Sequence, residues 1–185
     1  YRSLFNNSID AVLLTAPDGT ILSANPAACR MFGHTEEAIC RIGRAGLMDM
    51  TDPRLPAALE KRALTGQFRG ELNFVRKNGS SFPGEISSVI FTDHDGKQKT
   101  SVIIRDITER KLGETRQEQF AKIMEFSLNE IYVFNAETLL FEYVNKGALR
   151  NLGYTLESML KMTPVQLNPE FDEASFRQTI APLLR

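Results

Sequence analysis

The chain has 185 residues and a formal net charge of −1, with 42% hydrophobic and 24% charged residues. This length suits one ordinary domain, or one domain and part of another, and the composition predicts a folded rather than a disordered chain. The weak net charge argues against a nucleic-acid interface, and no apolar run approaches the roughly 18 residues of a membrane span. We therefore expect no nucleic-acid partner, no membrane contact by this segment and a cytoplasmic location, with a membrane anchor in a longer parent left open.

The first quarter of the chain predicts a hairpin and two short helices. Residues 11–25 hold two apolar runs around Pro-Asp-Gly, which is a hairpin signal. Asn25 suits a helix N-cap, and the helix it starts should end at Gly33. Thr35 is a suitable cap for a second helix.

The middle of the chain changes from a helical to an alternating pattern. A loop broken by prolines leads into a helix that should end near Gly66. Alternating apolar residues then predict three antiparallel strands, at about 68–76, 81–92 and 98–107, with glycine-containing turns between them. Two strands, short helices and three further strands indicate an α+β fold, with one five-stranded antiparallel sheet and helices packed on one face.

A mostly polar helix is predicted from residue 107 to about residue 127. Its apolar residues form a thin stripe rather than a broad face: Leu112, Phe120, Ile123 and Met124. Such a stripe is typical of a linker or of a two-stranded coiled coil.

After this helix the chain repeats its own beginning. Five residues of the first pattern recur in the same order with one inserted residue: Ser8, Asn25, Ala28, Gly33 and Thr35 correspond to Ser127, Asn145, Ala148, Gly153 and Thr155. No counterpart of the three later strands follows. We expect a domain over residues 1–110, a helical linker over 111–122 and the N-terminal part of a second, truncated domain over 123–185.

Three phrases together resemble the PAS domain family of sensory and dimerisation modules in bacterial and archaeal signalling proteins. They are "PDGTILSANPAACRMFGHTEEAI", "RKNGSSFPGEIS" and "IIRDITERK", and the resemblance covers nearly all of residues 1–110 and the front half of a module in 120–185. It implies a sheet whose concave face forms a ligand or cofactor pocket. It also implies a longer parent protein with an output domain, commonly a histidine kinase or a diguanylate cyclase.

The phrase "IIRDITERK" places a strand almost directly before a helix. Asp106 and Thr108 carry side-chain acceptors that suit the unpaired N–H groups of a helix start, and Asp106 with Glu109 has the spacing of a capping box. We expect these residues to relay a shift of the last strand into the helix. The alternative is an ordinary, well-capped helix start.

Apolar side chains from the helices and strands predict an adaptable interior for the pocket. The candidates are Met31, Phe32, Met48, Met50, Leu59, Phe74, Ile86 and Ile104. The same residues would also fill an ordinary core. The pocket is therefore expected to hold no ligand, with a small apolar or amphipathic metabolite as the alternative.

Among the cofactors that PAS domains bind, the sequence argues against two in this chain and leaves a third open. A covalent flavin adduct of the light-oxygen-voltage type would need a cysteine where this chain has Gly43. A haem would need an axial histidine on the helix before the first long strand, and that helix has none. Non-covalent flavin binding needs no short motif and remains possible, although the chain has no tryptophan to stack on the ring.

No catalytic constellation appears in the sequence, which lacks a phosphate-binding glycine loop and a nucleophile elbow. We expect no enzymatic activity. The two cysteines, Cys29 and Cys40, are too few for a disulfide framework, so free thiols are expected, with a redox-sensing role as a weaker alternative.

The outer face of the predicted sheet is also apolar. Ile103 and Ile107 on the last strand, and Val89 and Phe91 on the middle strand, share the parity that one layer of helices leaves uncovered. We expect the N-terminal segment or a second subunit to cover this face, and favour a homodimer formed through it and continued along the linker helix. The functional hypotheses are thus a ligand-gated sensory module and a ligand-free structural dimerisation spacer.

Overall fold

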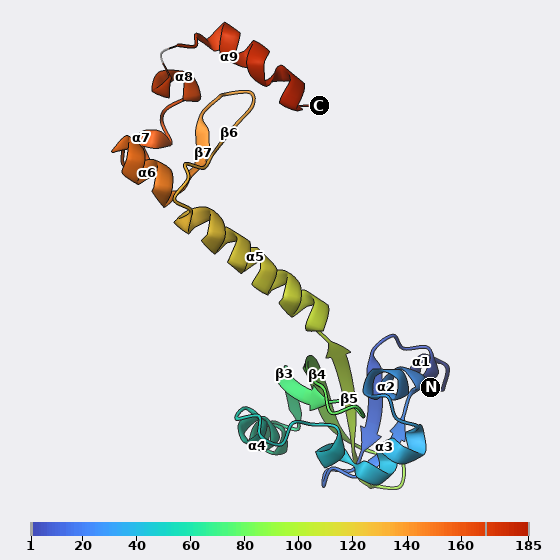
Figure 1. The fold of residues 1–185 in the computed structure, drawn as a ribbon. Helices are drawn as coiled ribbons and strands as arrows, with labels where there is room; N and C mark the ends of the chain where they lie inside the picture. The colour runs from blue at the N-terminus through green and yellow to red at the C-terminus, as the bar shows by residue number, and fades with distance from the viewer. Residues whose placement is uncertain (1, 169, 185) are drawn as a thin grey trace. The chain divides into compact units, whose positions relative to one another are not determined.

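A computed structural model describes residues 2–168 and 170–184, and the chain divides into two compact units, Tyr1–Leu112 and Gly113–Arg185 (Figure 1). The first unit contains five strands: β1 (Ala11–Thr15), β2 (Ile21–Ala24), β3 (Gln67–Val75), β4 (Ser81–Thr92) and β5 (Gln98–Asp106). They form one antiparallel sheet in the order β2-β1-β5-β4-β3. The predicted fold class is therefore confirmed, and the last strand lies at the centre of the sheet.

Five helical segments complete the first unit: α1 (Arg2–Asn6), α2 (Pro26–Phe32), α3 (Glu36–Ile42), η1 (Arg44–Gly46) and α4 (Leu55–Thr65). The predicted caps are present. The Asn25 side chain accepts a hydrogen bond from the backbone N–H of Ala28 at 2.8 Å, and Thr35 caps α3 in the same way. Gly33 ends α2 with φ of 72°, a left-handed conformation that glycine adopts without the steric cost of a Cβ atom.

The core lies between these helices and one face of the sheet. Alternate residues of the strands point into it and are almost fully buried, among them Leu72, Ile86 and Ile104. On the other face of the sheet, Val89, Phe91 and Ile103 are 47%, 40% and 42% exposed. The outer apolar face thus exists as predicted for these three residues.

Ile107 was predicted on that outer face, and this assignment is wrong. The ladder between β4 and β5 ends at the pair Gly84 and Asp106, so strand alternation no longer applies at residue 107. The backbone N–H of Ile107 instead donates to the carbonyl of Pro83 at 3.1 Å, and the side chain is only 4% exposed.

The predicted polar helix is present as α5 (Thr108–Phe126). The second unit contains β6 (Tyr132–Phe134) and β7 (Phe141–Val144), paired antiparallel, followed by α6 (Lys146–Leu152), α7 (Leu156–Met159), α8 (Pro164–Leu167), α9 (Glu173–Ile180) and η2 (Ala181–Leu184). Its small core consists of Phe141, Val144, Ala148 and Met159. None of the helices in the described part of the chain is long and apolar enough to cross a membrane.

One buried asparagine organises the same local structure in both units. Asn25 and Asn145 are both 0% exposed. The Oδ1 atom of Asn25 accepts from the backbone N–H groups of Val12 and Ala28, and that of Asn145 accepts from those of Ile131 and Ala148. In each unit the Nδ2 group donates to backbone carbonyls of the segment before the hairpin. The repeat seen in the sequence is therefore also a repeat of hydrogen-bond geometry.

Candidate functional site

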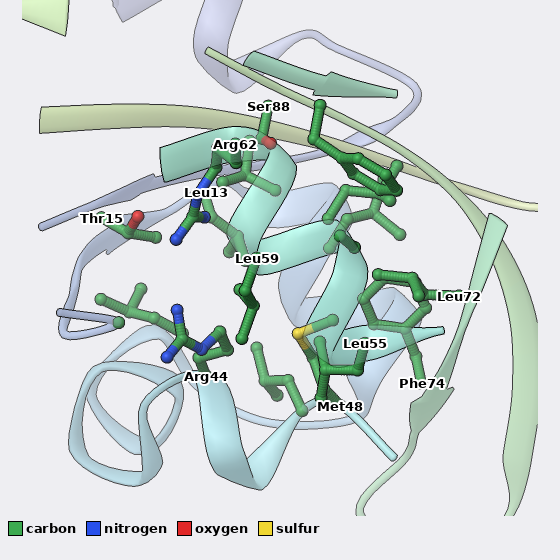
Figure 2. A pocket seen from close by; sticks show the side chains of 18 residues that line it. Leu13, Thr15, Arg44, Met48, Leu55, Leu59, Arg62, Leu72, Phe74 and Ser88 are labelled. Carbon is green, nitrogen blue, oxygen red and sulfur yellow. The ribbon is translucent and has the colours of Figure 1, made fainter. Parts of the chain in front are cut away.

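The first unit contains a cavity of about 40 Å³ between the inner face of the sheet and the segment from η1 to α4 (Figure 2). Its wall is mostly apolar and includes Leu13, Leu55, Leu72 and Phe74. This volume holds a few water molecules, whereas pockets for drug-sized ligands are usually about 300–1,000 Å³. A larger ligand would enter only if lining side chains moved.

Five of the eight predicted pocket residues line this cavity: Met48, Leu59, Phe74, Ile86 and Ile104. Phe32 is fully buried but lies in the core beside it, where its ring packs 6.0 Å from that of Phe74. Met31 is half-buried and packs against the same core. Met50 is 56% exposed and lies away from the cavity, because the chain turns where the backbone N–H of Thr51 donates to the carboxylate of Asp49.

Four polar residues of the cavity were not predicted from the sequence: Thr15, Arg44, Arg62 and Ser88. Arg62 could have been found, because Leu55, Ala58, Leu59 and Arg62 follow the helical spacing of one face of α4. An arginine at the last position of this inward face of α4 indicates that one end of the apolar cavity is polar. Neither cysteine and neither histidine lines the cavity.

The junction between β5 and α5 is organised by the carboxylate of Asp106. Its Oδ1 atom accepts from the backbone N–H of Thr108 at 2.9 Å and from the Thr108 hydroxyl at 2.6 Å. The bond reaches residue i+2, so the junction is a turn closed by Asp106, and the capping box predicted between Asp106 and Glu109 does not form. Burial alone would raise the pKa of Asp106, but the bonds from Thr108 and Arg76 outweigh it and lower that pKa.

Arg76, just after β3, connects this junction to the core. Its Nη2 atom pairs with Oδ2 of Asp106 at 2.5 Å, and its Nη1 atom donates to the carbonyl of Met31. The guanidinium also lies 3.9 Å from the centroid of the Phe82 ring, at a cation–π distance. Sequence reasoning missed Arg76, which pairs with a residue 30 positions away.

A second connection joins β3 to the first turn of α5. The carboxylate of Glu71 pairs with Arg110 at 2.7 Å and with Lys111 at 2.9 Å. The hydrogen bond from Lys111 is the main cause that lowers the pKa of Glu71. Glu71 stands beside Leu72, which lines the cavity, so one strand contacts both the cavity and the helix.

Residues 9–109 match the PAS domain family. The chain belongs to this family. Over 118 residues it is 27% identical to the sensor histidine kinase TmoS of Ectopseudomonas mendocina, in an alignment that covers 60% of this chain and 12% of that protein. Over 166 residues it is 24% identical to sporulation kinase E of Bacillus subtilis, covering 86% of this chain and 22% of the kinase. The PAS domain is thus homologous to parts of sensor kinases, and the chain spans less than a quarter of either relative.

Solved structures agree with the fold. The crystal structure of a PAS domain from Colwellia psychrerythraea matches with a TM-score of 0.53 at 21% identity, over 58% of this chain and 94% of that one. An RNA-binding light-oxygen-voltage receptor matches with a TM-score of 0.53 at 21% identity, over 66% of this chain and 36% of that one. At these identities the likeness shows the fold alone.

Proposed function

We propose that the first unit is a sensory input domain, in which a change in the cavity is relayed through the junction at Asp106 and Thr108 into α5. The output domain would lie elsewhere in a longer protein and be of the histidine kinase or diguanylate cyclase type. The kinase relatives support this proposal. We propose the domain boundaries 1–110, 111–122 and 123–185 for the sensory domain, the helical linker and the following segment.

One arrangement carries the proposal: the strands that form the cavity wall also hold the start of α5. On β3, Leu72 and Phe74 line the cavity, while Glu71 binds the first turn of α5. On β5, Ile104 lines the cavity, and Asp106 closes the turn into the helix. A shift of either strand would therefore change ionic contacts of α5, and typical allosteric couplings need only about 1–3 kcal/mol.

Filling the cavity tests this relay without knowledge of a ligand. Ala58 lines the cavity, so Ala58→Val adds two methyl groups to its wall, whereas the exposed Ala63 carries the same change on the same helix as a matched control. We expect Ala58→Val, but not Ala63→Val, to change hydrogen exchange at the backbone amides of Thr108 and Lys111. Leu59→Ala enlarges the cavity and should move the exchange the other way. If hydrogen exchange at these amides is unchanged in both cavity variants, the result would favour the hypothesis of a structural dimerisation spacer.

We propose that the outer face of the sheet is a homodimer interface, continued by α5. The exposed side chains of Val89, Phe91 and Ile103 support this, since adjacent apolar residues on a strand surface favour a cover. The interface serves both the sensory and the spacer hypotheses. Light scattering should show that Ile103→Lys converts a dimer to a monomer. If the unsubstituted chain is strictly monomeric at high micromolar concentration, the proposed interface is refuted.

We propose that residues 123–185 are the N-terminal part of a second PAS domain. The matching hydrogen bonds of Asn25 and Asn145 support it, as do the helix caps at Thr35 and Thr155 and the left-handed glycines at 33 and 153. If this is right, a longer chain that supplies three further strands should stabilise the second unit against thermal unfolding. No gain in stability would contradict the assignment.

For the cavity itself we propose a small ligand or none rather than a cofactor. A flavin ring is far larger than a cavity of about 40 Å³ and would require extensive rearrangement. An absorbance scan and a native mass spectrum of the purified chain test this directly. A flavin spectrum would refute it, and a small co-purifying mass would favour the sensory over the spacer hypothesis.

A further inference from the structure

One end of the cavity carries two arginines. Arg44 comes from η1 and Arg62 from the inward face of α4. Figure 2 shows their side chains pointing toward each other near Thr15, whereas Met48, Leu55 and Phe74 lie at the other end. The cavity is thus apolar at one end and cationic at the other.

No carboxylate in the described part of the chain reaches ion-pair distance of this pair of like charges. In the described part of the chain neither guanidinium forms an ion pair; Arg44 makes one long bond, at 3.5 Å, to the backbone carbonyl of Asp18. The carboxylate of Asp18 is the acidic group near Arg44, and it accepts from the backbone N–H of Thr20. Burial and then the charge of Arg44 lower the pKa of Arg62, yet an arginine stays protonated in proteins. Two facing cations in a half-buried site therefore favour a bound anion.

Two residues with hydroxyl groups lie at the same cavity. Thr15 is 6% exposed and Ser88 is 2% exposed, and both line the cavity. Thr100, opposite Thr15 in the sheet, has a buried hydroxyl without a hydrogen-bond partner among the described residues, but it does not line the cavity. A ligand with acceptor oxygens would offer hydrogen-bond partners to the hydroxyls of Thr15 and Ser88.

We propose that this cavity, widened by movement of its lining side chains, binds a small organic acid, with its carboxylate between Arg44 and Arg62 and its short apolar body against Leu55, Leu59 and Leu72. The proposal rests on the sensory function proposed above and names the class of ligand. Arginine pairs with a carboxylate through two parallel hydrogen bonds, which suits a planar anion with two oxygens. Phosphate pairs with arginine in the same way, but it has no apolar body to bury against these leucines.

Titration calorimetry of the whole chain tests the proposal with three probes: hexanoate, its neutral analogue hexanamide, and inorganic phosphate. We expect hexanoate to bind at least about tenfold more tightly than either other probe, and Arg62→Gln or Arg44→Gln to weaken it at least about tenfold. Lys61→Gln, an exposed neighbour on α4, is the matched control and should leave binding unchanged. Circular dichroism checks that each variant folds.

A second measurement needs no ligand. If Arg62 is a cation without a charge partner and its role is to bind the acid, Arg62→Gln should raise the melting temperature of the ligand-free chain. If Arg62 instead stabilises the fold, the same substitution should lower that melting temperature. The proposal is overturned if hexanoate fails to bind, if hexanamide or phosphate binds as tightly, or if Arg62→Gln lowers the melting temperature. These results would refute acid binding without refuting the proposed relay from the cavity to α5. Ala58→Val can still change hydrogen exchange at the amide of Thr108 when no acid binds.

Discussion

Arg76 and Asp106, 30 residues apart in the chain, form an ion pair of 2.5 Å at the point where the last strand leads into α5. Both side chains are 29% exposed, so water screens the pair only in part. Arg76 also bonds to the carbonyl of Met31 at the end of α2. A single guanidinium therefore connects a helix of the core, the end of β3 and the start of the outgoing helix.

Removing this guanidinium should loosen the junction. We expect Arg76→Gln to lower the free energy of unfolding by about 1–3 kcal/mol, because a charged hydrogen bond to a half-buried carboxylate is lost. Urea unfolding measures this loss. Arg69→Gln is the control: Arg69 pairs with Glu85 but is 77% exposed, and such surface pairs contribute about 0–1 kcal/mol. Equal losses in the two variants would show that the Arg76 pair has no special role.

Asp52 should make the fold sensitive to acid. Its carboxylate is buried and accepts from the side chain and backbone of Arg54 and from the backbone N–H of Asn73. The bond from the Arg54 side chain is the main cause that holds its pKa far below the ordinary value, despite burial. A lowered pKa in the folded state stabilises the fold fully above the unfolded pKa, about 3.9, and this contribution is lost as the pH falls toward the folded pKa.

We therefore expect Asp52→Asn to cost about 2 kcal/mol of unfolding free energy at pH 7, and the difference from the parent chain to shrink below about pH 4. Denaturant unfolding at a series of pH values measures it. Asp95→Asn, at an exposed turn, should show little effect at any pH. A cost for Asp52→Asn that grows as the pH falls would contradict the assignment.

The two buried asparagines should stabilise the two units separately. Asn25→Asp keeps the acceptor but removes the Nδ2 donor, which leaves the carbonyls of Phe5 and Asp10 without this partner and buries a charge. We expect a loss of about 3 kcal/mol or more in the first unit. Asn145→Asp should destabilise the second unit alone, since its bonds lie within that unit. Hydrogen exchange resolved by unit measures both, and an effect of Asn145→Asp on strands β1 to β5 would contradict this independence.

The cysteines should react slowly with electrophiles. Burial, followed by the charges of Glu36 and Glu37, raises the pKa of both the Cys29 and Cys40 thiols. A raised pKa leaves little thiolate near neutral pH, and the thiolate is the reactive form. We expect iodoacetamide at pH 8 to modify both thiols more slowly than free cysteine, and Glu37→Gln to speed the reaction. If iodoacetamide modifies either thiol as fast as free cysteine, the result would support the alternative of a redox-sensing role.

Local signals in the sequence predicted most of the fold. The α2 helix follows from three residues, Asn25, Pro26 and Gly33, whose preferences act within one or two turns. Strand alternation likewise predicted the buried face of β4 and β5. It failed at Ile107, because alternation holds only as far as the strand ladder, which ends one residue earlier.

The candidate site could be predicted only in part. Apolar lining residues such as Phe74 and Ile104 follow from strand parity. The contacts that give the site its chemistry join distant segments: Arg76 with Asp106, and Glu71 with Lys111. Those pairs depend on the register of three strands and on where a helix starts, which sequence spacing does not specify. The facing of Arg44 and Arg62 likewise depends on how η1 and α4 pack.

A double-mutant comparison of Ala58→Val and Arg76→Gln tests the proposed relay most directly. The measured quantity is hydrogen exchange at the amides of Thr108 and Lys111 in the parent chain, both single variants and the double variant. If the cavity acts on α5 through the Arg76 connection, Ala58→Val changes this exchange in the parent background and loses most of that effect when Arg76 is already Gln. An effect of Ala58→Val that is the same in both backgrounds, or absent from the parent chain, would contradict the account.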